Sequence, residues 1–95
     1  MHELHAFVNV FVEAPLLDDV VQALADVYAV EELYEVTGEF DIVALISASD
    51  IEELSDVLKN KIMKIKGVKS TVTSLVLSPH LVPNCKRQKL PLKKQ

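Results

Sequence analysis

Apolar positions along this chain recur with two different periods, which predict four strands and two helices. Four stretches are rich in β-branched, aromatic and aliphatic side chains, as strands are, and two others repeat apolar residues every three or four positions, as one face of a helix does. The expected strands are 6–12, 31–37, 41–48 and 68–77, and the expected helices are 16–28 and 50–66.

The expected helices have recognisable ends. Pro15 suits the first turn of the first helix, whose apolar stripe runs from Leu17 to Tyr28. Ser49 and Glu52 have the spacing of a capping box at the start of the second helix. Gly67 suits the left-handed residue that ends that helix. The stripe of the second helix is expected to consist of Ile51, Leu54, Leu58, Ile62 and Ile65.

The order strand, helix, strand, strand, helix, strand predicts a ferredoxin-like α+β sandwich. The three-residue link GEF between the second and third strands favours an antiparallel hairpin. We therefore expect a four-stranded antiparallel sheet with both helices on one face, as in dimeric α/β sandwiches or barrels. Residues 1–78 are expected to form this domain and residues 79–95 a flexible basic tail.

The second face of this sheet has no covering element in the chain. Phe7, Asn9 and Phe11 alternate with Ala6, Val8 and Val10 along the first strand, so both of its faces are mostly apolar. A half-solvated antiparallel sheet usually alternates apolar with polar residues, and a large apolar patch rarely stays exposed. We expect a symmetric second copy to cover this face, with these first three residues in the interface. The alternative is that the tail folds back over the sheet.

Length and composition limit the class of protein. Ninety-five residues fit one small domain. The start MHELHAF lacks the features of a signal peptide, and no apolar run is long enough to span a membrane. The single cysteine, Cys85, excludes an internal disulfide. These features predict a soluble cytoplasmic protein.

Charge is divided sharply along the chain. All 14 acidic residues lie between Glu3 and Asp56, and all 10 basic residues lie between Lys59 and Lys94. The last segment, KRQKLPLKKQ, is basic and can attract nucleic acid. It contains no aromatic residue to stack on a base, so a solvated terminus, or attraction to the acidic half of the chain, is the simpler interpretation.

The polar residues show no pattern of a metal or catalytic site. His2, His5 and His80 are scattered, and His80 with Cys85 is an isolated pair, whereas structural zinc takes about four closely spaced ligands. No glycine motif for nucleotides is present. We therefore predict no metal, no cofactor and no catalytic residue.

Residues 36–77 resemble the effector-binding RAM domain of the Lrp/AsnC family of regulators, and the likeness extends over about residues 4–77. The pattern combines a Val-Thr-Gly turn with an aromatic residue and an aspartate, an acidic helix start, a Gly-Val pair before the last strand, and alternating threonines in that strand. These features are carried by Val36, Thr37, Gly38, Phe40, Asp41, Gly67, Val68, Thr71, Thr73 and Leu75.

The resemblance implies a stand-alone RAM protein without the helix-turn-helix domain of full-length members. Such a protein is expected to form homodimers that assemble further, as in a tetramer of dimers, to bind an amino acid between dimers and to modulate transcription indirectly. It implies pairing with full-length family members and no direct reading of DNA. The implied ligand-binding residues are Thr37, Gly38, Phe40, Asp41, Thr71 and Thr73.

Elementary chemistry is compatible with these roles, and also with simpler ones. Asp41 can accept from the ammonium of an amino acid, and Gly38 lets a ligand approach the backbone closely. Thr71 and Thr73 offer hydroxyls on one face of a strand. However, Gly38 and Asp41 also suit a plain turn, and threonine favours strands anyway. A small ferredoxin-like enzyme of the oxygenase or isomerase type and a nucleic-acid binder acting through the tail are the alternative functions.

Overall fold

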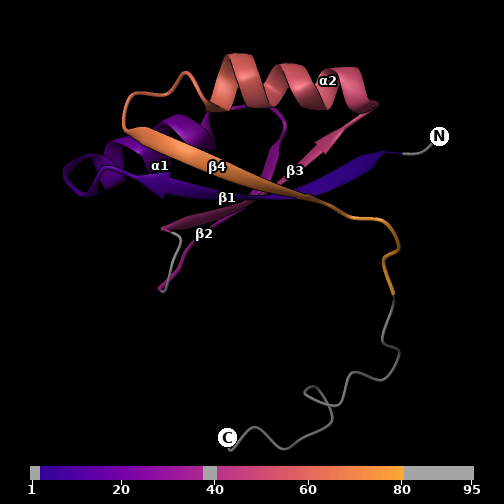
Figure 1. The fold of residues 1–95 in the computed structure, drawn as a ribbon, viewed down its shortest axis with the longest axis horizontal. Coiled ribbons are helices and arrows are strands. Elements are labelled where there is room, and N and C mark those ends of the chain that lie inside the picture. Colours follow the sequence, from indigo (N-terminus) through magenta and orange to yellow (C-terminus); the bar gives the residue numbers. More distant parts are fainter. Residues whose placement is uncertain (1–2, 38–40, 81–95) are drawn as a thin grey trace, which may run out of the picture.

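The computed structural model describes residues 3–37 and 41–80. They form a four-stranded sheet with helices packed against it (Figure 1). The strands are β1 (Leu4–Val12), β2 (Val30–Glu35), β3 (Ile42–Ala48) and β4 (Val68–Leu75). A short 3₁₀ turn (Ala14–Leu16) leads into α1 (Leu17–Ala25), and α2 (Ile51–Asp56) continues into a π-helical segment (Val57–Ile62).

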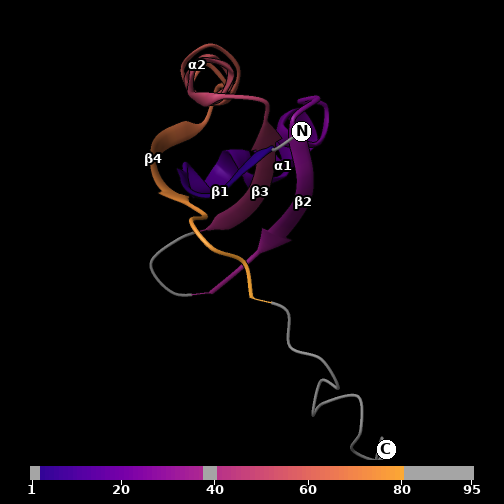
Figure 2. The same cartoon turned by 90° about the vertical axis from the view of Figure 1, so that its right-hand side faces the viewer.

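The strands lie in the order β2-β3-β1-β4, and all three pairings are antiparallel. The labels follow this order across Figure 2. β1 and β4 are neighbours although they lie at opposite ends of the domain sequence, as the ferredoxin-like topology requires. The fold prediction is therefore confirmed, including the β2–β3 hairpin.

The core lies between one face of the sheet and the two helices. β1 and β3 each contribute every second residue to it, so the strand period of two decides which side chains are buried. Val20 and Leu24 of α1 and Val57 and Ile62 of the π-helical segment join the same cluster, and all four are fully buried. The strand residues in this cluster are Ala6, Val8, Val10, Val12, Ile42, Ala44, Ile46 and Ala48.

Gly67 is required by both backbone conformation and space. Its φ is +105°, which L-residues rarely adopt. A Cβ built there would lie 2.8 Å from Cγ2 of Val20 and 2.9 Å from Cβ of Leu16. Its carbonyl also accepts from the N–H of Glu13 at 2.8 Å. The turn after the second helix therefore packs directly on the first helix. The positive φ of Gly67 agrees with the prediction, but the second helix ends at Ile62 rather than at the predicted residue 66, so Gly67 does not cap it directly.

The first helix is shorter than predicted. It ends at Ala25 rather than at residue 28, and Tyr28 is 66% exposed instead of completing the apolar stripe. The chain turns at Asp26, whose N–H donates to the carbonyls of Ala23 and Leu24, and it then enters β2. The periodic spacing of Tyr28 was therefore coincidental.

The second helix departs from the predicted stripe at its first residue, and its later turns widen. Val57 is fully buried, whereas the predicted Ile51 is 57% exposed. The N–H of Met63 donates to the carbonyl of Leu58 at 2.9 Å, which is the i→i+5 bond of a π-helix. Residues five apart therefore share a face here, which brings Val57 into line with Ile62.

Candidate functional site

Asp41 closes the end of the sheet where β1 and β3 stop pairing. Its carboxylate Oδ2 accepts from the N–H of Val12 at 2.8 Å. Its own N–H donates to the carbonyl of Val10 at 3.2 Å, and its carbonyl accepts from the N–H of Val36 at 3.1 Å. The side chain thus replaces the next main-chain partner of the β1–β3 ladder. This structural role is the simpler one foreseen for Asp41, although the bond is to the neighbouring strand rather than within the turn.

The rest of this predicted turn is only partly described. Thr37 is exposed, while Gly38 and Phe40 lie outside the described residues. The bond to Val12 uses only one of the two carboxylate oxygens of Asp41. A carboxylate has about four acceptor sites, so Asp41 can serve the backbone and still accept from a ligand.

Thr71 and Thr73 lie on β4, on the same side of the sheet as the helices. They pair with Val10 and Val8 respectively, which are core residues. Thr71 is half-buried and Thr73 is exposed, because β4 is the edge of the sheet. Both hydroxyls therefore share one face, as predicted.

One chain does not bring the threonines together with Asp41. Val10 pairs with Ile42 on one side and with Thr71 on the other, so β1 separates the two groups. Two strand spacings amount to about 10 Å, and the ammonium and carboxylate of one amino acid lie much closer together than that. The predicted ligand set is therefore split within a single subunit, and its joint role stays a prediction.

The predicted interface residues lie on the face opposite the helices. Phe7 is 43% exposed, while Asn9 and Phe11 are half-buried. Val43 and Leu45 of β3 are the partners of Asn9 and Phe7 in the register, and both are half-buried. We call this surface the open face; its centre consists of Phe7, Asn9, Phe11, Val43 and Leu45.

The edges of the open face are more polar than its centre. Ser70 and Ser74 of β4 pair with Phe11 and Phe7, with the 50% exposed Val72 between them. On β2, the hydroxyl of Tyr34 donates to Oε1 of Glu32 at 2.6 Å, and this bond raises the pKa of Tyr34. An apolar centre within a polar rim is the usual anatomy of a protein interface.

Asn9 makes its hydrogen bond inside the subunit. Its Nδ2 donates to the carbonyl of Val72 at 3.4 Å. The distance is long for such a bond. An asparagine on an apolar strand face suggests a bond across a dimer interface. Its side-chain oxygen has no part in the bond to Val72, so the bond across an interface stays a prediction.

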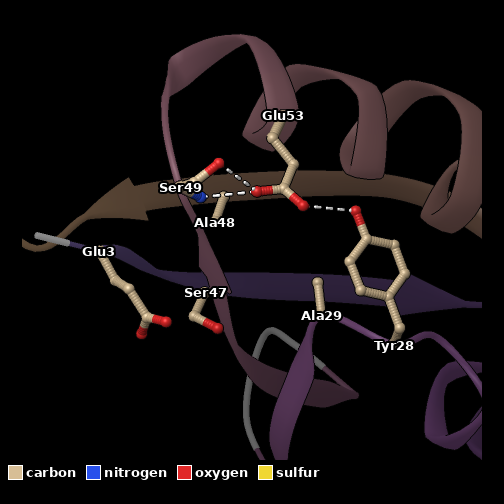
Figure 3. A pocket seen from close by; sticks show the side chains of 7 residues that line it. All are labelled: Glu3, Tyr28, Ala29, Ser47, Ala48, Ser49 and Glu53. Carbon is tan, nitrogen blue, oxygen red and sulfur yellow. Dashed lines mark hydrogen bonds between the residues drawn. The ribbon is translucent and has the colours of Figure 1, made fainter. Parts of the chain in front are cut away.

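A small polar hollow of about 230 Å³ lies where β3 meets the start of α2 (Figure 3). The carboxylate of Glu53 is its main charged group. Oε1 accepts from the N–H of Ser49 at 2.6 Å and from its hydroxyl at 2.9 Å, and Oε2 accepts from the hydroxyl of Tyr28 at 2.7 Å. The lining residues are Glu3, Tyr28, Ala29, Ser47, Ala48, Ser49 and Glu53.

These bonds perturb the pKa values of both partners. The Ser49 N–H, followed by the Tyr28 and Ser49 hydroxyls, lowers the pKa of Glu53. The bond to Glu53 in turn raises the pKa of Tyr28. A carboxylate that stays ionised and is already hydrogen-bonded is a poor general base, so this hollow does not favour acid–base catalysis.

Glu53 belongs to a helix cap that sequence analysis placed one residue too early. Asp50, not Ser49, is the N-cap, and its Oδ1 accepts from the N–H of Glu53 at 2.8 Å. Glu53 rather than Glu52 reaches back to Ser49. The stretch SDIEE offers two overlapping frames of the same motif, and aspartate is as good an N-cap as serine.

A second hollow of about 690 Å³ adjoins the open face. It lies between the start of β1 and the segment that follows β4, where the N–H of Val76 donates to the carbonyl of His5 at 2.8 Å. The lining residues are Glu3, Leu4, His5, Phe7, Leu45, Val76, Leu77, Pro79 and His80. This hollow could not be predicted from the sequence, because its two walls lie at opposite ends of the domain sequence.

The helices in the described part of the chain are too short or too polar to span a membrane.

Comparison with known proteins identifies the domain. The family model of the Lrp/AsnC ligand binding domain matches residues 5–82. An uncharacterized HTH-type transcriptional regulator of Pyrococcus horikoshii, PH0140, is 38% identical over 77 residues, which are 81% of this chain and 49% of that protein. This chain thus spans about half the length of that regulator.

Solved structures agree with this match. TTHA0845 of Thermus thermophilus is 34% identical with a TM-score of 0.79, and the match covers 83% of this chain and 99% of that one. The feast or famine regulatory protein Rv3291c of M. tuberculosis, solved with L-methionine, is 27% identical with a TM-score of 0.73, over 85% of this chain and 54% of that one.

One similar protein has a different function. Homocitrate synthase of Sulfurisphaera tokodaii is 41% identical over 58 residues, which are 61% of this chain and only 12% of the enzyme. The likeness therefore concerns a small part of that enzyme. The family model and the ferredoxin-like fold together show that this chain belongs to the Lrp/AsnC ligand-binding domain family.

Proposed function

We propose that this protein is a regulatory module that pairs through the open face of its sheet and binds an amino acid at contacts between subunits. One observation carries the pairing. Phe7, at the centre of the open face, is 43% exposed in the single chain, and the half-buried Phe11, Val43 and Leu45 surround it. A second copy that buries roughly 800 Å² on each side forms an ordinary stable interface.

Assembly also explains how the divided ligand residues act together. β1 separates Asp41 from Thr71 by about two strand spacings, roughly 10 Å. A neighbouring subunit can supply the complementary group to each half, so that the ammonium and the carboxylate of the ligand are bound by different chains. The methionine complex of the similar M. tuberculosis regulator supports an amino acid as the ligand class.

The family context supports a regulatory output. Similar domains occur in transcription regulators and within homocitrate synthases, which suits a sensing module that serves different partners. We propose that this chain modulates transcription indirectly in the cytoplasm, by pairing with full-length family members, and that residues 79–95 act as a separate basic tail. We propose no catalytic residue: of the two carboxylates that line the polar hollow, Glu53 already belongs to a helix cap.

Thermal shift with the twenty amino acids, L-methionine included, tests the ligand. An amino acid present at 100 times its dissociation constant adds about 2.7 kcal/mol to the free energy of unfolding, which raises the melting temperature of a domain this small by about 10–20 °C. Native mass spectrometry of the same samples reports whether the ligand appears on oligomers only. If no amino acid at millimolar concentration raises the melting temperature, the sensor proposal fails.

Three variants separate the ligand role of Asp41 from its structural role. Asp41→Asn removes the charge but keeps an oxygen that can accept from the N–H of Val12, so it should abolish the ligand-induced shift and largely keep the basal melting temperature. Asp41→Ala removes both functions and should also lower basal stability by about 1–3 kcal/mol. Asp50→Asn, at the cap of α2, is the matched control and should respond to ligand normally. An unchanged ligand response in Asp41→Asn would remove Asp41 from the site.

A further inference from the structure

We propose that Glu3, His5 and Glu31 form a binding site for a divalent transition-metal ion such as Zn²⁺. Nε2 of His5 lies 3.8 Å from Oε1 of Glu3 and 3.8 Å from Oε1 of Glu31. One ligand atom from each of the three residues lies within 4.8 Å of the other two. Imidazole with two carboxylates is a ligand set that suits zinc and its neighbours among the divalent metals.

The backbone brings these three residues together. Glu3 and His5 are two apart at the start of β1, so they point to the same side. His5 pairs with Ser47 of β3, and the small Ser47 side chain leaves room for a residue of β2 to approach from beyond it. Glu31 occupies that position, at the irregularity where the register shifts between Val30 and Glu32. A β-bulge commonly re-aims one side chain in this way.

Both sides of the cluster are fixed by main-chain hydrogen bonds. The N–H of Val76 donates to the carbonyl of His5 at 2.8 Å, and the N–H of Ser47 donates to the carbonyl of Ala29 at 3.0 Å. The first bond attaches β1 to the segment after β4, and the second attaches β3 to the start of β2. His5 and Glu31 are therefore carried by backbone that does not need to rearrange when an ion binds.

The distances between the imidazole and the two carboxylates suit three ligands around an ion better than direct hydrogen bonds between the side chains. A distance of 3.8 Å is too long for a hydrogen bond, so neither carboxylate is bonded directly to Nε2. Donor atoms about 2.0–2.1 Å from a tetrahedral metal are roughly 3.3 Å apart. The side chains of Glu3 and Glu31 are 58% and 42% exposed, so both can make the small movement required. A positive ion would also relieve the repulsion between the two carboxylates.

The site is separate from the predicted amino-acid site. β1 runs from the cluster at its first residues to Val12 at its last, where Asp41 is bound. The two sites thus lie at opposite ends of the sheet. A metal here would link β1 to the edge strand β2 across β3, next to the hollow beside the open face, whose wall includes Glu3 and His5.

Sequence spacing could not reveal this cluster. We predicted no metal site because the histidines and Cys85 are scattered along the chain. The third ligand, Glu31, is distant from His5 in the chain and meets it only through strand pairing and the bulge. The useful signal, a Glu-x-His pair at the start of a strand, is too common to predict a metal by itself.

Calorimetric titration of the untagged full-length chain with ZnCl₂ tests the proposal. We expect one ion per chain, with a dissociation constant below about 10 µM, and a higher melting temperature that EDTA reverses. His5→Gln and Glu31→Gln should each weaken binding at least about 10- to 100-fold, since loss of even an outer-shell partner costs that much. Glu35→Gln, an exposed residue elsewhere on β2, is the matched control and should bind normally.

A second control excludes binding by the His80 and Cys85 pair. The double variant His80→Gln with Cys85→Ser should retain the full affinity for Zn²⁺. Loss of binding in this variant, or unchanged binding in His5→Gln, would overturn the proposal, as would the absence of any binding of Zn²⁺, Ni²⁺ or Co²⁺ by the unaltered chain at about 100 µM, tenfold above the expected dissociation constant. Circular dichroism confirms that each variant is folded, so that loss of binding is not loss of structure.

Discussion

The two faces of the sheet have similar apolar residues at their centres but very different surroundings. On β1, Ala6, Val8 and Val10 are fully buried beneath the helices, whereas Phe7, which lies between two of them in the chain, is 43% exposed. On β3, Ile46 is fully buried and its neighbour Leu45 is only half-buried. The chain therefore contains enough apolar residues for two covered faces, while its described helices cover one.

This difference distinguishes the face that stabilises the folded chain from the face that is available for association. The helix-covered face supplies the burial that folds one chain, because area removed from water stabilises by about 25 cal/mol per Å². The open face supplies the same kind of surface, and none of the described helices covers it. Polar residues of the edge strands, such as Ser70, Ser74 and Glu32, partly frame this apolar area, which resembles an interface more than an exposed core.

The largest expected effect comes from comparing neighbouring residues on opposite faces of β3. Ile46→Ala should lower the free energy of unfolding by about 2–5 kcal/mol, because it leaves a cavity in a packed core. Leu45→Ala should cost only roughly 1 kcal/mol in dilute solution, where the open face is solvated. Urea denaturation at low protein concentration measures both. Equal costs would mean that something in the chain itself covers the open face.

A charge on the open face should separate the subunits without unfolding them. Phe7→Asp should raise the dissociation constant of the dimer at least about 100-fold, which corresponds to roughly 2.8 kcal/mol, while circular dichroism stays unchanged. Sedimentation equilibrium measures the constant. The matched control is Ile51→Asp, whose side chain is 57% exposed on α2, and it should leave association intact. A wild-type chain that is monomeric at all concentrations would contradict the proposed pairing.

The smallest expected effect is a change in the pH dependence of stability, through a carboxylate of α2 on the helix-covered side of the sheet. The pKa of Glu53 is lowered from the ordinary value of 4.5 in the folded chain by bonds from Ser49 and Tyr28. A lowered folded-state pKa contributes stability that is present above pH 4.5 and is lost as the pH falls through the lowered value. Glu53→Gln should therefore flatten the decline in melting temperature below pH 4.5. Glu52→Gln is the control, and an identical acid profile in wild type and Glu53→Gln would show that these bonds do not persist in solution.

Local patterns predicted most elements because each depends on neighbouring residues. The strand period placed Val8 and Phe7 on opposite faces, and Gly67 has the predicted positive φ, although the second helix ends earlier, at Ile62. Predictions failed where two local solutions competed. Asp50 displaced Ser49 as the N-cap, and Val57 is buried in the core whereas Ile51, in the first turn of α2, is exposed.

The candidate sites were less predictable because they depend on which strands become neighbours. Asp41 could be recognised as a candidate from its turn, but its bond to the N–H of Val12 links residues 29 positions apart. The separation of Asp41 from Thr71, by contrast, follows from the position of β1 between β3 and β4, which the predicted ferredoxin-like topology already implied. The approach of Glu31 to His5 requires both the sheet order and a bulge in β2.

The amino-acid sequence by itself determined the order of elements, the face on which each strand residue lies and the excess of apolar surface, because the periods of helices and strands are local properties of the chain. Only the tertiary structure decided which polar groups meet, because contacts across a sheet depend on strand order, register and bulges. Those features are set by the packing of the whole core rather than by any one segment. The carboxylates proposed to bind, Asp41 and the pair of Glu3 and Glu31, therefore lie near the ends of strands, where tertiary pairing brings distant residues within a few ångströms of each other.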